Sequence, residues 1–369
     1  MNLILSTCGT SILTNHVDEQ LRHLLTQHAN VKKEDEIPAS KRGRIRDHIE
    51  QRGQQFARLS WQEAQRDSAE LNGILSFYER PPIPSGESHY LLATDTWFGE
   101  ETAKIAEAWL RKNGVANVNV IRHPDLQTAD WQYFRSSLAD LVKWCAETIA
   151  PQRTEHCRVV FNLSGGFKSE TGFLQMLGMF YADETIYMFE RSGELMRIPR
   201  LPVRMEDEPA IERDLSDFRR AALDLKVHAA KSGIYWFEMD GQSYLTPWGQ
   251  LVFDQHKERI YRQAIHPPPS DRIVFHNKDF LPSCEKETAI HKQQVNEAID
   301  LLACFLEKDN QPNPNKLNFH SLNKQPKKDV RYKNVTHEFY AWSNDDAKRV
   351  YCRMTEEGKV ELLFLDKHL

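Results

Sequence analysis

The stretch CRVVFNLSGGFK, residues 157–168, joins a short apolar run to a loop of small residues and to the start of a helical pattern. The apolar run is typical of a buried strand, and the pattern from Lys168 to Ala182 is typical of a helix. Its two adjacent glycines allow a tight turn. This strand–loop–helix unit predicts one repeat of a parallel sheet covered by helices.

The rest of the first 200 residues repeats this alternation. A polar segment, residues 30–79, is expected to be a helical insertion after the first strand. Further strands are expected at Asn2–Leu5, His89–Ala93, Val115–Ile121 and Thr185–Glu190, and further helices at Glu100–Lys112 and Trp131–Ile149. Short apolar strands alternating with helices predict an α/β fold with a parallel, doubly wound sheet.

Near Pro199-Arg200-Leu201-Pro202 the alternation stops, because two prolines in four residues interrupt regular structure. We therefore expect a first domain over residues 1–200. A helical stretch from about Asp214 to Ala230, followed by two strand-like runs around Asp240-Gly241, predicts a small winged-helix-like domain over residues 201–281.

Residues 282–369 are expected to form a third domain of the α+β class. An amphipathic helical pattern over Lys286–Glu307 opens it. Strand-like runs follow at Leu317–Leu322, Thr336–Trp342, Arg349–Met354 and Val360–Leu365. A helix followed by four such runs predicts an antiparallel sheet.

The composition limits the function classes. The chain has 369 residues, 48 Lys plus Arg against 53 Asp plus Glu, and a formal net charge of -5. This acidity gives no reason to expect generic nucleic-acid binding, so such a role needs a local basic patch. The six cysteines are scattered without a CxxC pair, which favours reduced thiols and excludes a disulfide framework or a zinc site. With no signal-peptide pattern and no long apolar run, we expect a soluble, cytoplasmic protein without a membrane partner.

The loop Ser164-Gly165-Gly166 ends a strand and precedes Lys168, so helix N–H groups and one cation can face a ligand there. The loop from Ser6 to Ser11, with Thr10, follows the first strand in the same way. Ligands of open α/β sheets bind at the carboxyl ends of the strands, so the two loops predict an anion site. Thr94, Asp95 and Trp97, after another strand, are candidates for the same pocket.

Tight structural turns are the alternative for both loops. The chain has neither GxxxxGK[ST] nor GxGxxG, so nucleoside triphosphate hydrolysis and NAD binding are poorly supported.

The other chemical signal is a basic patch near the C-terminus. Its cations are Lys316, Lys324, Lys327, Lys328, Arg331 and Lys333, against Asp329 alone. More polar and aromatic residues follow on the expected sheet: His337, Tyr340, Lys348, Arg349, Tyr351, Arg353, Lys367 and His368. Cations, histidine and tyrosine with few acidic residues suit metal-free RNA cleavage, in which the 2′-hydroxyl attacks the adjacent phosphate. A solvated surface loop is the alternative for the patch.

Two family resemblances agree with these signals. The STCGTS loop after the first strand and the NLSGGFK loop resemble those of the CARF domain of CRISPR-associated proteins. The resemblance implies a Rossmann-like fold, a homodimer and a pocket for cyclic oligoadenylate, often cyclic tetra-adenylate. It implies that Ser11 and Lys168 correspond to residues with which some CARF domains cut their activator. The expected ligand-binding residues are Ser6, Thr10, Ser11, Thr94, Gly165, Gly166 and Lys168.

The segment from Leu317 to Leu369 is similar to the RelE family of ribosome-dependent mRNA interferases. By position, Arg349 matches an arginine opening the penultimate strand, and Lys367 or His368 matches the basic pair ending the last strand. The paired lysines of that family fall near Glu338 and Tyr340, which are not lysines. His337 or the lysines of residues 324–333 are the candidate replacements.

Together the resemblances imply a CRISPR-linked mRNA interferase of type III systems, with a winged helix between sensor and effector. The expected catalytic residues are Arg349, His337, Lys367, His368 and Tyr340. The expected RNA-binding residues are Lys324, Lys327, Lys328, Arg331, Lys333, Lys348 and Arg353. The partners are the cyclic activator, mRNA and the ribosome, with no metal or cofactor. A transcription regulator and a ring nuclease stay open as alternatives.

Overall fold

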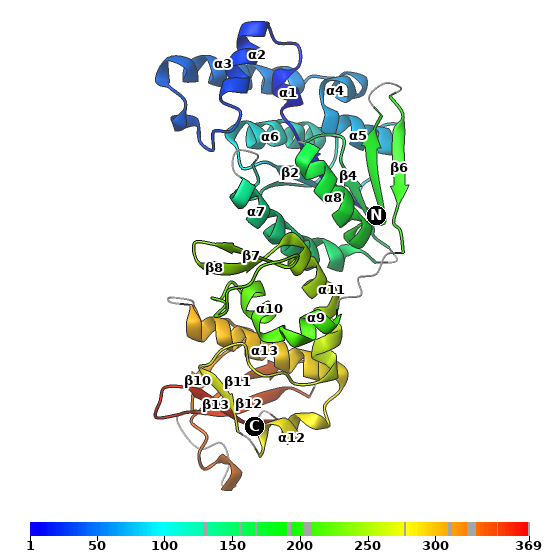
Figure 1. Cartoon of the computed structure of the whole chain (residues 1–369). Coiled ribbons are helices and arrows are strands. Elements are labelled where there is room, and N and C mark those ends of the chain that lie inside the picture. The colour runs from blue at the N-terminus through cyan, green and yellow to red at the C-terminus, as the bar shows by residue number, and fades with distance from the viewer. Residues whose placement is uncertain are drawn as a thin grey trace. The chain divides into compact units, whose positions relative to one another are not determined.

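The computed structural model describes the chain apart from residues 128–130, 155, 167, 190–192, 203–207, 277, 309–311, 323–329, 345 and 368–369. Side chains are also left undescribed at residues 131–133, 168–169 and 208–209. The chain divides into two compact units, Met1–Arg204 and Met205–Leu369 (Figure 1). Among the described helices, none is long and apolar enough to cross a membrane.

The first unit is built on a six-stranded sheet in the order β3-β2-β1-β4-β5-β6. The strands are β1 (Asn2–Cys8), β2 (Ser88–Ala93), β3 (Asn117–Arg122), β4 (Arg158–Asn162), β5 (Glu184–Met188) and β6 (Leu195–Pro199). The first five are parallel, and β6 pairs antiparallel with β5 at the edge. The α/β class and the parallel sheet are confirmed, whereas β6 was not predicted.

Helices pack on both faces of this sheet, as its apolar strands require. On one face, α5 (Ala69–Tyr78) and α6 (Trp97–Lys112) share a core with Ile4 and Val160. On the other face, α8 (Lys168–Tyr181) approaches Phe161, the neighbour of Val160 on β4, at Gly178. The remaining helices are α1 (Ser11–Thr14), α2 (Glu19–Gln27), α3 (Ala39–Phe56), α4 (Trp61–Asp67) and α7 (Trp131–Trp144).

The segment between β1 and β2 is helical, as predicted. A capping box begins α4, because the Ser60 side chain accepts from the Glu63 N–H and the Glu63 carboxylate accepts from the Ser60 N–H. This reciprocal arrangement satisfies two N–H groups that a helix start leaves without partners.

The second unit begins with two short helices and a hairpin. They are α9 (Glu208–Arg213), α10 (Leu215–Ala222), β7 (Trp236–Met239) and β8 (Gln242–Leu245). Asp240 and Gly241 both have positive φ, which suits the two-residue turn of such a hairpin. The hairpin matches the prediction, but α10 ends well before Ala230. The long helix that follows, α11 (Pro247–Gln263), was not predicted.

The C-terminal part of this unit is a five-stranded sheet in the order β10-β11-β12-β13-β9. Its elements are β9 (Ile273–Phe275), α12 (Phe280–Glu285), α13 (Ala289–Glu307), β10 (His320–Ser321), β11 (His337–Trp342), β12 (Lys348–Met354) and β13 (Val360–Lys367). The antiparallel ladder from β10 to β13 agrees with the predicted order. Two details differ: β9 adds a parallel edge strand, and only His320–Ser321 of the run at 317–322 is strand.

A buried ion pair ties three helices of the second unit together. Arg219 on α10 donates to Asp300 on α13 at 2.9 and 2.6 Å, and Tyr261 on α11 donates to the same carboxylate at 2.6 Å. The side chains of Arg219 and Asp300 are 0% and 5% exposed. Separating these two groups would leave an uncompensated charge in the interior. The ion pair and the Tyr261 hydrogen bond therefore hold the three helices together. The predicted boundary at 281/282 lies between the helices that this ion pair joins.

Candidate functional site

The loops that follow β1 and β4 are in contact. Thr7 donates a hydrogen bond of 2.6 Å from its hydroxyl to the carbonyl oxygen of Gly165. A Cβ added at Gly9 would lie 3.1 Å from the backbone nitrogen of Gly166. The two loops predicted to form an anion site therefore meet at the carboxyl ends of adjacent strands.

The double glycine is required by this loop-to-loop packing. A Cβ on Gly165 would lie 2.6 Å from the carbonyl oxygen of Thr7. Gly166 has a φ of 86°, and a Cβ there would lie 2.9 Å from the Cβ of Thr7. Both glycines are therefore explained by the fold, whether or not a ligand also approaches them.

Glu70, which the sequence reasoning missed, organises the first loop. It lies in the first turn of α5, is fully buried, and accepts from the Gly9 N–H at 2.8 Å. Its other oxygen accepts from Ser11 at 3.1 Å and from Ser68 at 2.8 Å. Three donors hold one buried carboxylate, so the position of Ser11 depends on Glu70.

The residues predicted for this pocket lie at different depths. Ser6 and Thr94 are buried, and Ser6 accepts from the Asn162 side chain at 3.1 Å. Thr10 and Ser11 are half-buried at the start of α1. Lys168 is the first residue of α8, and its side chain lies outside the described ones.

Carboxylates dominate the described electrostatics of these loops. Burial, and then the charges of Glu70 and Glu170, raise the pKa of the Cys8 thiol. Glu170 is itself buried, and its Oε2 lies 3.3 Å from the Cβ position of Gly166. An anion bound here needs a compensating cation, and Lys168 is the residue that the sequence supplies.

The C-terminal sheet sorts the predicted nuclease residues onto two faces, because directly opposed residues of an antiparallel ladder share a face. One row of opposed residues is Tyr340, Arg349 and Asp366, and the next row is His320, Glu338, Tyr351 and Phe364. Irregularities after Tyr340 and after Tyr351 shift the register. The opposite face presents Trp342, Lys348 and Lys367 in one row, with His337 further along.

The first face carries a compact cluster around Glu338. Its Oε1 lies 3.7 Å from a guanidinium nitrogen of Arg349 and 3.5 Å from Nε2 of His320. The guanidinium carbon of Arg349 lies 3.5 Å from the centre of the Tyr340 ring. Glu338 and His320 were not among the predicted site residues, because the pairing register that brings them to Arg349 cannot be read from local sequence.

The histidine of this cluster has a defined orientation. Nδ1 of His320 lies 2.8 Å from the carbonyl oxygen of Asn318, which can only accept a hydrogen bond. Nδ1 therefore carries the proton, and Nε2 faces Glu338. Burial, then the charges of Glu338 and Asp366, raise the pKa of the neighbouring Tyr351 to about 12.

The predicted residues of the other face have different partners. Lys367 pairs with Asp346 at 2.6 Å, and Lys348 pairs with Glu287. His337 stacks on Phe319, with ring centres 5.2 Å apart. Burial, and then the charge of His320, lower the pKa of His337. These residues are thus separate from the cluster that holds Arg349.

The structure describes only some of the predicted RNA-binding residues. Lys324, Lys327 and Lys328 lie outside the described residues, as does His368, which was predicted to be catalytic. Arg353 pairs with Glu361 at 2.6 Å, and Lys333 is exposed. Arg331 lies beside Asp366, 3.7 Å from its carboxylate.

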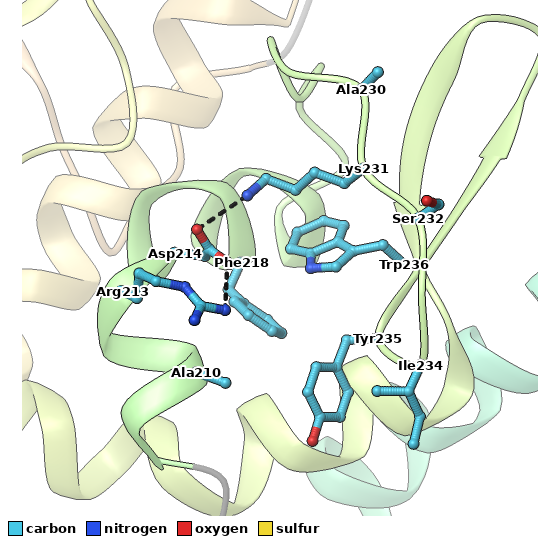
Figure 2. Close-up of a pocket in the computed structure, with 10 residues that line it drawn as sticks. All are labelled: Ala210, Arg213, Asp214, Phe218, Ala230, Lys231, Ser232, Ile234, Tyr235 and Trp236. Atoms are coloured by element: carbon cyan, nitrogen blue, oxygen red, sulfur yellow. Dashed lines mark ion pairs between the residues drawn. The ribbon is translucent and has the colours of Figure 1, made fainter.

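The second unit also contains a hollow of about 530 Å³ between α9, α10 and the segment before β7. Figure 2 shows Lys231 reaching Asp214 across its rim, above the rings of Phe218 and Trp236. Burial alone would lower the pKa of Lys231, but its bonds to Asp217 and Asp214 raise it. None of the predicted site residues lines this hollow. Among the described residues, no group of three or more His, Cys, Asp and Glu could hold a metal ion.

One comparison with known proteins bears on the first unit. Residues 65–201 match the family described as CRISPR-associated protein (Cas_APE2256). The matched segment includes Glu70, Gly165 and Gly166. No curated protein matches the chain. The match covers less than half of the chain, so it shows that this segment of the first unit is similar to a family of CRISPR-associated proteins.

Proposed function

We propose that this protein is a CRISPR-associated endoribonuclease that cyclic oligoadenylate activates and that cuts mRNA on the ribosome. The observation that carries the nuclease half is the cluster of Glu338, His320 and Arg349 on one face of the C-terminal sheet. A carboxylate with an imidazole 3.5 Å and a guanidinium 3.7 Å from it supplies the groups that metal-free RNA cleavage needs.

The chemistry follows from the arrangement. The Glu338 carboxylate takes the proton of the RNA 2′-hydroxyl, whose oxygen then attacks the adjacent phosphorus. Arg349 stabilises the negative charge that builds on the non-bridging oxygens. Protonated His320 gives its Nε2 proton to the departing 5′-oxygen. The products are a 2′,3′-cyclic phosphate and a 5′-hydroxyl end, so no external water molecule is consumed in the step.

The burial of the cluster supports a gated enzyme. The side chains of Arg349 and Glu338 are 9% and 8% exposed, whereas that of His320 is 42% exposed. A phosphate therefore reaches Arg349 only after the surroundings of its guanidinium move. An activator that favours the open arrangement would raise the rate by shifting that population.

The sensor half of the proposal is supported by the contact between the loops after β1 and β4 and by the family match of residues 65–201. We assign cyclic tetra-adenylate to these loops in a homodimer, with Ser11 and Lys168 nearest the ligand. Glu70 is the residue that holds Ser11 in place. Coupling between this pocket and the nuclease cluster requires two global states of the dimer.

The experiment is a translating cell-free extract to which the full-length protein is added with or without cyclic tetra-adenylate. Primer extension maps the 5′ ends of a reporter mRNA. We expect new in-frame cuts that need both the activator and ribosomes and that disappear in Arg349→Ala and Glu338→Gln. Lys359→Ala, an exposed cation on the β12–β13 turn paired with Glu357, is the matched control and should cut normally.

Two outcomes would contradict the proposal. Intact mRNA despite bound activator would remove the nuclease half and favour a ring nuclease or a regulator. Cuts that persist unchanged in Glu338→Gln would leave an interferase but remove Glu338 as its base.

A further inference from the structure

A second arginine lies on an aromatic ring on the same face as Arg349. The guanidinium carbon of Arg331 is 4.1 Å from the centre of the Phe364 ring. Phe364 is 2% exposed, and it packs edge to face on Tyr332, with ring centres 5.0 Å apart. The ring under Arg331 is therefore fixed in the sheet.

The neighbours of Arg331 hold it in place. Asp366 lies 3.7 Å from its guanidinium, and the same carboxylate accepts from the Tyr332 hydroxyl at 2.7 Å and from the Lys367 N–H at 2.8 Å. A carboxylate with these two further donors has a fixed position. It anchors one edge of the guanidinium while Phe364 supports one of its sides.

The register places this arginine next to the proposed chemistry. Asp366 is directly opposite Arg349 in the β12–β13 ladder, and Phe364 is directly opposite Tyr351. Cβ atoms of such opposed pairs are roughly 5 Å apart. Asp366, which lies beside Arg331, is thus the cross-strand neighbour of Arg349. The Arg331 side chain is 44% exposed, in contrast to the 9% of Arg349.

We propose that Arg331 is a base-stacking residue of the ribonuclease site. The nucleobase beside the scissile phosphate stacks on the face of the Arg331 guanidinium that is opposite Phe364. This inference rests on the proposed RNA substrate. A guanidinium that rests on an aromatic ring offers its other face to an unpaired base, which can stack on it in addition to any contact with phosphate. The substrate class is therefore single-stranded RNA with its bases unstacked from each other.

The difference in exposure separates two functions in the site. Arg331 is accessible without any opening, so it should contribute to RNA binding with or without the activator. Arg349 is enclosed, so its contribution should be confined to the cleavage step.

The test is a binding titration of full-length protein with a short single-stranded RNA. The RNA carries 2′-O-methyl groups, which prevent cleavage, and one 2-aminopurine, whose fluorescence falls when it stacks. We expect Arg331→Ala to weaken binding about 5- to 100-fold. Arg331→Lys keeps the charge but not the plane, so it should bind with an intermediate affinity and lose the fluorescence quenching. Lys359→Ala should match the unmodified protein.

The outcomes distinguish this inference from the proposed function. Equal quenching and affinity in Arg331→Lys and the unmodified protein would overturn the stacking role while leaving the nuclease intact. Quenching that depends on Arg331, in a protein that cuts no RNA under activation, would support the stacking role and remove the nuclease. RNA that fails to bind the unmodified protein would overturn the stacking role, whereas ribosome-dependent cleavage is tested separately by the primer-extension experiment.

Discussion

The two candidate sites are built in different ways. In the first unit, the site consists of loops that follow β1 and β4, and each loop is a continuous stretch of sequence. In the second unit, the cluster of His320, Glu338 and Arg349 lies on a sheet face and takes one residue from each of three strands. Loop sites can be recognised from short motifs, whereas a face site depends on strand register.

The largest expected effect tests whether the proposed cleavage takes place on the face of the sheet that carries Arg349. Arg349→Ala should slow single-turnover RNA cleavage by about 10²- to 10³-fold, because it removes the cation nearest the developing charge. Lys367→Ala, on the other face, should change the rate by no more than about fivefold, since its exposed pair with Asp346 contributes little.

Arg349→Lys keeps a positive charge beside Glu338 and is the control for folding. A larger loss in Lys367→Ala than in Arg349→Ala would mean that the chemistry takes place on the other face of the sheet.

The next effect tests the loop contact. Gly166→Ala should lower the free energy of unfolding by about 2–3 kcal/mol, because a left-handed backbone and an overlap with Thr7 both oppose a Cβ. Hydrogen exchange of the full chain, followed in peptides over residues 1–14 and 158–181, would report it.

Gly172→Ala, on helix α8 that follows the loop of Gly166, is the matched control. A Cβ there meets nothing within 4 Å, so the change should be neutral or should stabilise the helix by up to about 1 kcal/mol. Equal effects of the two substitutions would contradict the packing role of Gly166.

A smaller effect is expected for Glu70→Gln. Glutamine keeps one oxygen but loses the charge that three donors share, so urea unfolding should show a loss of about 1–2 kcal/mol. Glu50→Gln, exposed on α3, should change nothing measurable. An unchanged Glu70→Gln protein would remove Glu70 as the residue that holds Ser11.

The smallest effect concerns His337. Burial, then the charge of His320, lower its pKa, so the unfolded chain binds a proton there more readily than the folded protein. The folded state should therefore lose stability as the pH falls below the ordinary histidine range near 6.5. His337→Gln should reduce that loss between pH 7 and pH 5.5 in thermal unfolding. An identical pH dependence in the two proteins would contradict this account.

Much of the first unit follows from the sequence alone, for a physical reason. Strands buried on both faces are continuous apolar runs, so β1, β2 and β4 and the loops after β1 and β4 can be recognised locally. Glu70 could not be identified in this way, because it lies about 60 residues from Gly9 and its role depends on where α5 packs.

The cluster of His320, Glu338 and Arg349 was harder to predict. Side chains alternate between faces along a strand, so every irregularity exchanges the two sets. The regular pairing of His337–Tyr340 with β12 places Arg349 on the face of Glu338 and Lys348 on the face of His337, and Lys367 is paired with Lys348. The acidic residue at position 338 was itself a signal, because a carboxylate among several predicted cations can act as a base.

The buried pair of Arg219 and Asp300 has a consequence for how this protein can be divided. A fragment that starts at residue 282 keeps Asp300 on α13 but lacks both Arg219 and Tyr261, the donors that hold it. The Asp300 carboxylate would then be either an unpaired charge in an apolar interior or an additional charge on an exposed face of α13. The C-terminal sheet is therefore not a module that can be transferred to another protein by itself. A fusion needs the whole second unit, from α9 onward.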